Sequence, residues 1–215
     1  MDQLTDSLKV FIDENKYQGL EWIVQHKNKK YSGLLGFSDN EKKIKLKKNT
    51  IYRIWSMTKP IISVVILQMI EEKKISFNDP VNYFLPKFED LKVLKENFEN
   101  INDIENVNIK PTIRHLLLHT AGFSYNFLGD IIAKEYHNIR LFNSENNSLE
   151  NEINTLSTLP LLYKPGNKWV YSVATDILAR IIEVVSGNNL EIELKKRLFE
   201  PLEMKDTGFS IKEKS

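Results

Sequence analysis

The segment that decides the fold spans residues 55–70 and reads WSMTKPIISVVILQMI. From Ile61 onward it is apolar at nearly every position, which predicts a helix buried in a protein core. Pro60 suits the first turn of that helix, where a missing backbone N–H costs little. Ser56 and Lys59 therefore lie three positions apart, at the start of the most hydrophobic helix of the chain.

The spacing of Ser56 and Lys59 suits nucleophilic catalysis. Side chains at i and i+3 of a helix share a face, so the hydroxyl and the amine can meet. A serine is a weak nucleophile unless a neighbour takes its proton, and a lysine with a lowered pKa can do so. N–H groups at a helix start also favour the charge that develops during attack. A helix-capping serine followed by a surface lysine is the plain alternative.

Tyr171 is the third candidate site residue. It follows a loop at 164–170 and precedes a helix expected over 174–186, whose apolar face is formed by Ile177, Ile181, Val184 and Val185. A tyrosine at such a junction can act as a general base if cations lower its pKa from about 10. The alternative is a packed ring with a hydrogen-bonded hydroxyl.

The flanking sequence predicts a mixture of helices and strands. Helical spacing of apolar residues predicts an N-terminal helix through Leu4, Leu8, Phe11 and Ile12. Two β-prone runs, 20–25 and 31–37, enclose a polar turn and predict a hairpin, and 51–54 predicts another short strand.

The second half of the chain contains further short elements. Short helices are expected over 112–119 and 190–199. The stretches 41–50, 96–108 and 142–154 are rich in lysine, asparagine or other polar residues and are expected to be loops.

Composition excludes several classes of protein. The chain has 215 residues, a formal net charge of +1 and no cysteine. The charge gives no basic surplus for nucleic acid or a membrane surface, and the lack of cysteine excludes disulfides and a cysteine nucleophile. The N-terminus has no basic and apolar signal pattern, and the longest apolar run, 61–70, is about half a membrane span. A cytoplasmic location is therefore expected.

Two histidines, His115 and His119, lie four positions apart, a spacing that can bind zinc. The residue after His115 is Leu116, not the glutamate of a zinc protease, so structural histidines and no metal are expected. A triad that joins Ser56 to one of them stays open, because triads are defined by geometry. No nucleophile elbow or glycine-rich phosphate loop is present, so no cofactor is expected.

Several segments, taken in order, resemble the serine β-lactamase-like hydrolases, which include class C β-lactamases, DD-peptidases and related carboxylesterases. The resemblance covers nearly the whole chain. Its segments are RIWSMTKP at 53–60, NDPV at 78–81, TIRHLLLHTAGF at 112–123, YS at 171–172 and FEPLEMKDTGF at 199–209.

The resemblance implies a mechanism with an acyl-serine intermediate. Ser56 would be the nucleophile and its backbone N–H half of the oxyanion hole. Lys59 would share in activating Ser56, and Tyr171 would be the second general base and protonate the leaving group. Val173 stands where the lactamases and peptidases carry asparagine, as in many of the esterases. This difference implies small carboxylic esters rather than β-lactams as substrates.

The resemblance also implies an α/β fold of the α+β type, with an antiparallel sheet flanked by helices plus a mostly helical region. One incomplete β-lactamase-like domain over 1–215 is expected, with a sheet part at 1–55 and 188–215 and a helical part at 56–187. The family's third motif and last strands have no counterpart here. The sheet is therefore expected to be incomplete and to self-associate through an unpaired edge.

Two alternatives to an esterase stay open. One is a truncated, non-catalytic remnant or binding protein, and the other is a β-lactamase or DD-peptidase. The expected partner is a small-molecule ester or amide substrate, with neither nucleic acid nor membrane. Labelling of Ser56 by a phosphonate that reacts with active-site serines would separate an enzyme from a remnant.

Overall fold

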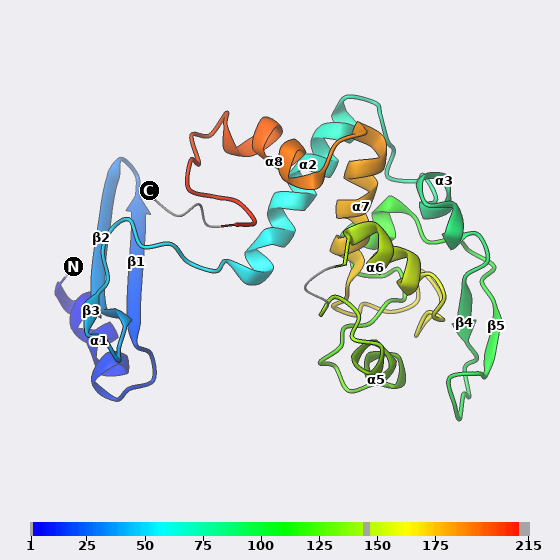
Figure 1. The fold of residues 1–215 in the computed structure, drawn as a ribbon, viewed down its shortest axis with the longest axis horizontal. Helices are drawn as coiled ribbons and strands as arrows, with labels where there is room; N and C mark the ends of the chain where they lie inside the picture. The colour runs from blue at the N-terminus through cyan, green and yellow to red at the C-terminus, as the bar shows by residue number, and fades with distance from the viewer. Residues whose placement is uncertain (1, 144–146, 211–215) are drawn as a thin grey trace. The chain divides into compact units, whose positions relative to one another are not determined.

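A computed structural model describes residues 2–143 and 147–210 of the chain. The chain divides into two compact units, residues 1–54 and residues 55–215. The first unit, blue in Figure 1, consists of one helix and a three-stranded sheet: α1 (Asp2–Asp13), β1 (Gly19–His26), β2 (Lys29–Asp39) and β3 (Ile44–Lys45).

The predicted N-terminal helix and hairpin are confirmed. Strands β1 and β2 pair antiparallel from Gly19 opposite Gly36 to His26 opposite Lys29, and α1 packs against both. A Cβ at Gly33 would lie 2.5 Å from Nε1 of the Trp22 indole. Glycine at this position therefore allows the indole to lie flat on the neighbouring strand.

The predicted strand at 51–54 is wrong, because these residues form no ladder. The third strand is β3, inside the lysine-rich stretch that was expected to be a loop. It pairs with the end of β2 around an irregularity between Phe37 and Asp39. A two-residue strand of this kind is held by cross-strand pairing and leaves no periodic pattern in the sequence.

The second unit is mostly helical (Figure 1). Its elements are η1 (Trp55–Met57), α2 (Thr58–Glu71), α3 (Val81–Phe84), η2 (Pro86–Phe88), β4 (Lys92–Leu94), β5 (Ile104–Asn106), α4 (Ile113–Leu117), α5 (Ile131–Asn138), α6 (Leu149–Leu156), α7 (Ala174–Ser186), α8 (Leu190–Leu194) and the π-helical η3 (Lys195–Phe199).

Helix α7 is central to this unit and packs against α2, α3, α4, α6 and α8. It has the predicted bounds, and it ends at Gly187, whose φ of 71° is left-handed. Its fully buried apolar face faces α2, whose own buried residues are Ile62, Val65, Ile66 and Met69. The two most apolar helices therefore form the core that supports the candidate site.

Two stretches that were expected to be loops contain regular structure. Strand β5 lies within 96–108 and pairs antiparallel with β4. Helix α6 begins within 142–154, of which residues 144–146 lie outside the described residues, and it continues to Leu156. The Ser148 hydroxyl caps α6 by accepting the backbone N–H of Asn151, and Ile153 and Leu156 are buried. Long-range pairing and packing stabilise both elements, despite their polar composition.

The C-terminal part of the described chain is tied to α2 by ion pairs. Arg197 bonds Glu193 at 2.6 Å and Glu72 at 2.7 Å, and so joins η3 and α8 to the end of α2. Between 188 and 210 the structure has helices and turns, and 211–215 lie outside the described residues. The assignment of 188–215 to a sheet part stays a prediction. No described helix has both the length and the apolar character that a membrane span requires.

Candidate active site

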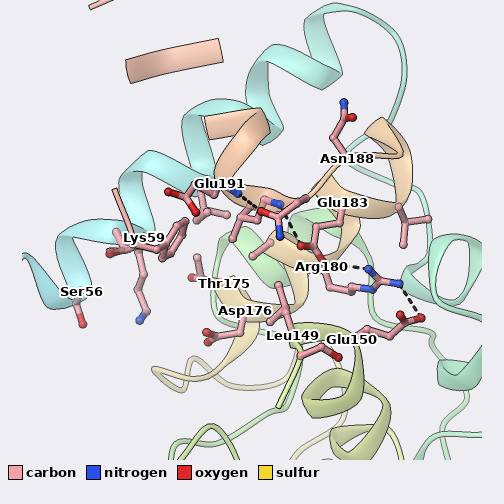
Figure 2. A pocket seen from close by; sticks show the side chains of 18 of the residues that line it. Ser56, Lys59, Leu149, Glu150, Thr175, Asp176, Arg180, Glu183, Asn188 and Glu191 are labelled. Carbon is pink, nitrogen blue, oxygen red and sulfur yellow. Dashed lines mark hydrogen bonds and ion pairs between the residues drawn. The ribbon is translucent and has the colours of Figure 1, made fainter. Parts of the chain in front are cut away.

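Ser56 lies in η1, the single turn that leads into α2, and its hydroxyl is exposed. The Tyr171 hydroxyl donates a hydrogen bond of 2.7 Å to Oγ of Ser56. Lys59 lies on the first turn of α2, and Figure 2 shows its side chain and that of Ser56 leaving the same end of the helix. The structure thus brings together the three residues singled out from the sequence.

The ammonium group of Lys59 lies against two tyrosine rings. Its Nζ is 4.8 Å from the ring centroid of Tyr171 and 5.1 Å from that of Tyr125. The two rings stack with centroids 5.6 Å apart and an interplanar angle of 12°. Aromatic faces at this distance attract a cation, so the pair of rings holds the lysine beside Ser56.

The pKa of Lys59 is raised above its ordinary value. Partial burial alone would lower this pKa, but the hydrogen bond to Tyr171 and the negative potential of Tyr125, Tyr171 and Asp176 outweigh burial. Lys59 is therefore a cation at neutral pH. A cation at this position favours negative charge beside it.

The pKa of Tyr171 moves in the opposite direction and is lowered. Burial would raise it, but the hydrogen bonds with Ser56 and Lys59 and the positive charge of Lys59 more than offset burial. A tyrosine with a lowered pKa, in contact with a serine hydroxyl, has the geometry of a general base. Of the two basic candidates, Tyr171 suits that task better than Lys59.

Asp176 adds a carboxyl group to the site from the first turn of α7. Burial raises its pKa to about 6, although the charge of Lys59 and the carboxyl group's own backbone N–H act against the rise. In Figure 2 the Asp176 carboxylate and the Lys59 amine both point into the pocket, from α7 and α2 respectively. After Tyr171 and Tyr125, Asp176 adds to the rise in the Lys59 pKa, and it partly opposes the ionisation of Tyr171.

The segment that carries Tyr171 is held by the turn after α4. Backbone N–H groups of 162–173 donate to carbonyl groups of 119–124, over distances of 2.7 to 3.1 Å; the pairs are Leu162 to Gly122, Gly166 to Thr120, Val170 to His119 and Val173 to Ser124. Gly122 has a φ of +93°, and a Cβ there would collide with the Tyr163 carbonyl oxygen. The glycine is needed for this close approach.

His115 and His119 each hydrogen-bond a residue other than Ser56. Nδ1 of His115 accepts the backbone N–H of Thr112, as part of a capping box at the start of α4. Nδ1 of His119 lies 3.2 Å from both the backbone N and the Oγ of Ser172. The hydrogen-bond partner that the structure gives Ser56 is Tyr171, so the geometry favours a Ser-Tyr-Lys cluster over a His-based triad.

A pocket of about 940 Å³ extends from this cluster along α7. Ser56, Lys59 and Asp176 line one part, and Asn188 and Glu191 line another. Between them, Arg180 pairs with Glu150 at 2.8 Å and with Glu183 at 3.0 Å, as the dashed lines in Figure 2 show. The size suits a small organic molecule. No group of three or more His, Asp or Glu side chains placed to hold a metal ion occurs within 2–143 or 147–210.

Sequence reasoning missed two residues of the cluster and one contact. Tyr125 has no local signal, because its role depends on stacking against a ring 46 positions away. Asp176 is an acidic residue in the first turn of a helix, an arrangement that the helix dipole alone explains. The contact of His119 with Ser172 arises only because the two segments pair in the fold.

The helical unit and its serine, lysine and tyrosine cluster define a class, that of the β-lactamase and penicillin-binding fold. The family model described as Beta-lactamase matches residues 4–214, so the chain belongs to the Beta-lactamase family. The family expected from the sequence is thereby confirmed, together with its mixed α/β fold.

Relatives with described activities include an esterase. Esterase EstB of Burkholderia gladioli is 27% identical over 190 residues, which are 87% of this chain and 45% of that protein. The structure of EstCE1, a hydrolase with promiscuous acyltransferase activity, aligns with a TM-score of 0.82 and 28% identity over 97% of this chain and 53% of that one. The octameric penicillin-binding protein homologue from Pyrococcus abyssi aligns with a TM-score of 0.72 and 25% identity, over 94% and 43%. The chain thus spans about half the length of these relatives.

Proposed function

We propose that the protein is a serine hydrolase that cleaves small carboxylic esters through an acyl-serine intermediate, without a cofactor. The observation that carries this proposal is the 2.7 Å hydrogen bond between Tyr171 and Ser56, beside the ammonium of Lys59. The similarity to Esterase EstB and to EstCE1 supports it.

In the first half of the reaction, Tyr171 in its ionised form accepts the proton of Ser56. The Ser56 oxygen attacks the ester carbonyl carbon, and the carbonyl oxygen becomes negatively charged. Lys59 stabilises the tyrosinate until it takes up the proton, and the backbone N–H of Ser56 donates one hydrogen bond to the oxyanion. Tyr171 then gives its proton to the departing alcohol, which leaves Ser56 acylated.

In the second half, water takes the place that the alcohol has left. Tyr171 accepts a proton from this water, whose oxygen attacks the acyl carbon. The Ser56–acyl bond breaks, Ser56 regains its proton from Tyr171, and the free acid is released. The same tyrosine thus serves both halves, as base in each attack and as acid in each departure.

The proposed preference for esters over β-lactams rests on Val173. This side chain is 1% exposed and belongs to the core, and its backbone N–H donates to the Ser124 carbonyl. The position therefore offers no amide to bond a lactam or peptide group. A site without this hydrogen-bond donor cannot use it to favour lactams or peptides over esters.

The test is steady-state hydrolysis of p-nitrophenyl acetate and of nitrocefin by the full-length protein. We expect acetate hydrolysis to exceed nitrocefin hydrolysis and to be abolished in Ser56→Ala. Ser63→Ala is the matched control, because Ser63 lies on the same helix and its hydroxyl donates to the Lys59 carbonyl, at 2.9 Å. A folded protein that hydrolyses neither compound indicates a non-catalytic relative, and faster nitrocefin hydrolysis indicates a β-lactamase.

The proposed partner is thus a small-molecule ester or amide. Self-association through an edge of the β1–β2–β3 sheet stays a prediction, and so does a cytoplasmic location. Size-exclusion chromatography of the full-length protein tests the first, and a monomer at all concentrations would contradict it.

A further inference from the structure

We propose that His119 is a positioning residue that holds the Tyr171 hydroxyl against Ser56 by binding the next residue in the chain, Ser172. This inference rests on the proposed function, in which Tyr171 is the general base. His119 does not touch the reacting atoms, and its effect passes through the backbone of residues 171–172.

The hydrogen bonds around His119 fix the Tyr171 segment at three points. The His119 carbonyl accepts the N–H of Val170 at 2.9 Å, and its Nδ1 lies 3.2 Å from both the N and the Oγ of Ser172. The imidazole also packs on the Tyr171 ring, with centroids 5.1 Å apart. One residue therefore binds the positions immediately before and after Tyr171 and covers its ring.

Ser172 is 1% exposed, so its backbone N–H is shielded from bulk water. Loss of the acceptor would leave this buried N–H without a hydrogen bond, which is destabilising. Without Nδ1, the segment must therefore shift to find a new partner. A shift of about 1 Å at a catalytic group can cost about a hundredfold in rate.

The contact requires an Nδ1 without a proton, because it accepts the N–H of Ser172. Burial and the nearby Lys59 lower the pKa of His119, which supports a neutral imidazole with its proton on Nε2. The charged and titratable groups around Tyr171 are Lys59 from α2, Asp176 from α7, Tyr125 and His119 itself. Of these groups, His119 forms hydrogen bonds with the backbone of 170–172.

Asparagine is the conservative replacement at this position. His119 has a φ of 54°, in the left-handed region that asparagine tolerates better than most residues. Its side-chain oxygen also comes close to the place of Nδ1 and can accept the N–H of Ser172. His119→Asn therefore keeps the acceptor, whereas His119→Ala removes it.

The test measures the titration of Tyr171 by NMR of tyrosine labelled at Cζ, assigned by comparison with Tyr171→Phe, together with kcat and KM for p-nitrophenyl acetate. In His119→Ala we expect the Tyr171 pKa to rise toward about 10 and kcat to fall by about a hundredfold, with little change in KM. His119→Asn should restore both values to near those of the wild type. His115→Ala is the matched control, because it also replaces a histidine, one that takes part in capping α4. It should lower thermal stability and leave the Tyr171 titration unchanged.

An unchanged Tyr171 titration in His119→Ala, or an equal change in His119→Asn, would overturn the inference. If His119→Ala does not fold, nitrogen NMR of the wild-type imidazole decides, because a proton on Nδ1 contradicts the contact. Absence of Ser56-dependent hydrolysis would refute the proposed function alone, since the titration of Tyr171 reports on its position without any turnover.

Discussion

The Tyr171 hydroxyl lies 2.7 Å from Oγ of Ser56, across 115 positions of the sequence. The two residues belong to different segments, one before α2 and one before α7, and these helices pack against each other. The stability of the core therefore bears directly on the geometry of the site, because the α2–α7 contact sets the distance between the two hydroxyls.

Replacement of Tyr171 by phenylalanine removes the proposed base and keeps the ring. We expect kcat/KM for p-nitrophenyl acetate to fall by about 10²–10⁴, the usual contribution of a general base. The melting temperature should change little, because the ring still stacks on Tyr125. Tyr83→Phe is the matched control, since Tyr83 is 75% exposed and does not line the pocket. Similar loss in both variants would contradict the role of Tyr171.

Replacement of Lys59 separates its role as a cation from a role as a base. Without the ammonium the Tyr171 pKa rises, so in Lys59→Met we expect the acidic limb of kcat/KM against pH to move to higher pH. Lys59→Arg keeps the positive charge and should retain more activity than Lys59→Met. If lysine were the neutral base, arginine would fail as completely as methionine.

Asp176 makes folding stability depend on pH. The folded protein raises its pKa from 3.8 to about 6, so the folded state retains a proton that the unfolded state loses between these values. Stability from this group is therefore present below about pH 4 and lost as pH rises through about 6, by about 3 kcal/mol in all.

The variant Asp176→Asn lacks this titration. Its melting temperature relative to the wild type should therefore increase between about pH 4 and about pH 7. The measurement is thermal unfolding of both proteins across that range. A difference that stays constant with pH would show that the carboxyl group is not the cause.

Arg197 is expected to contribute strongly to stability. Its side chain is 14% exposed and pairs with Glu193, which is 2% exposed, and with Glu72. Arg197→Leu should lower the free energy of unfolding by about 3–5 kcal/mol, because it leaves a buried carboxylate unpaired. Lys195→Leu is the control, since the exposed 3.7 Å pair with Glu200 should contribute less than about 1 kcal/mol. Chemical denaturation of both variants measures the difference.

The acid dependence of Arg197→Leu provides a second readout. Hydrogen bonds from Arg197 and Lys74 lower the pKa of Glu72 to about 2 from its ordinary 4.5. The stability that this shift provides is present above 4.5 and is lost as pH falls toward 2. The loss of folding stability over this pH range should therefore be smaller in Arg197→Leu than in the wild type.

Elements with strong local patterns could be predicted from the sequence. Helix α7 has an apolar face and a terminal glycine, and its bounds agree with the prediction. The β1–β2 hairpin has two β-prone runs around a polar turn. Strand β5 and helix α6 could not be predicted, because pairing with β4 and packing in the core overcome their polar composition.

The candidate site likewise contains residues that could be predicted from the sequence and contacts that could not. Ser56, Lys59 and Tyr171 lie in recognisable segments at helix starts, and the structure brings them together. The stacking of Tyr125 and the contact between His119 and Ser172 arise from pairing of 119–124 with 162–173. These contacts depend on the fold as a whole, and no local pattern of residues encodes them.

The most direct test of the central claim is the covalent modification of Ser56. The full-length protein is treated with a fluorophosphonate, digested and analysed by mass spectrometry, with heat-denatured protein and Ser56→Ala as controls. We expect one adduct, on the peptide that contains Ser56, in the folded wild type and in neither control. An adduct on another serine, or an unmodified Ser56 in folded protein that hydrolyses esters, would contradict the assignment of Ser56 as the nucleophile.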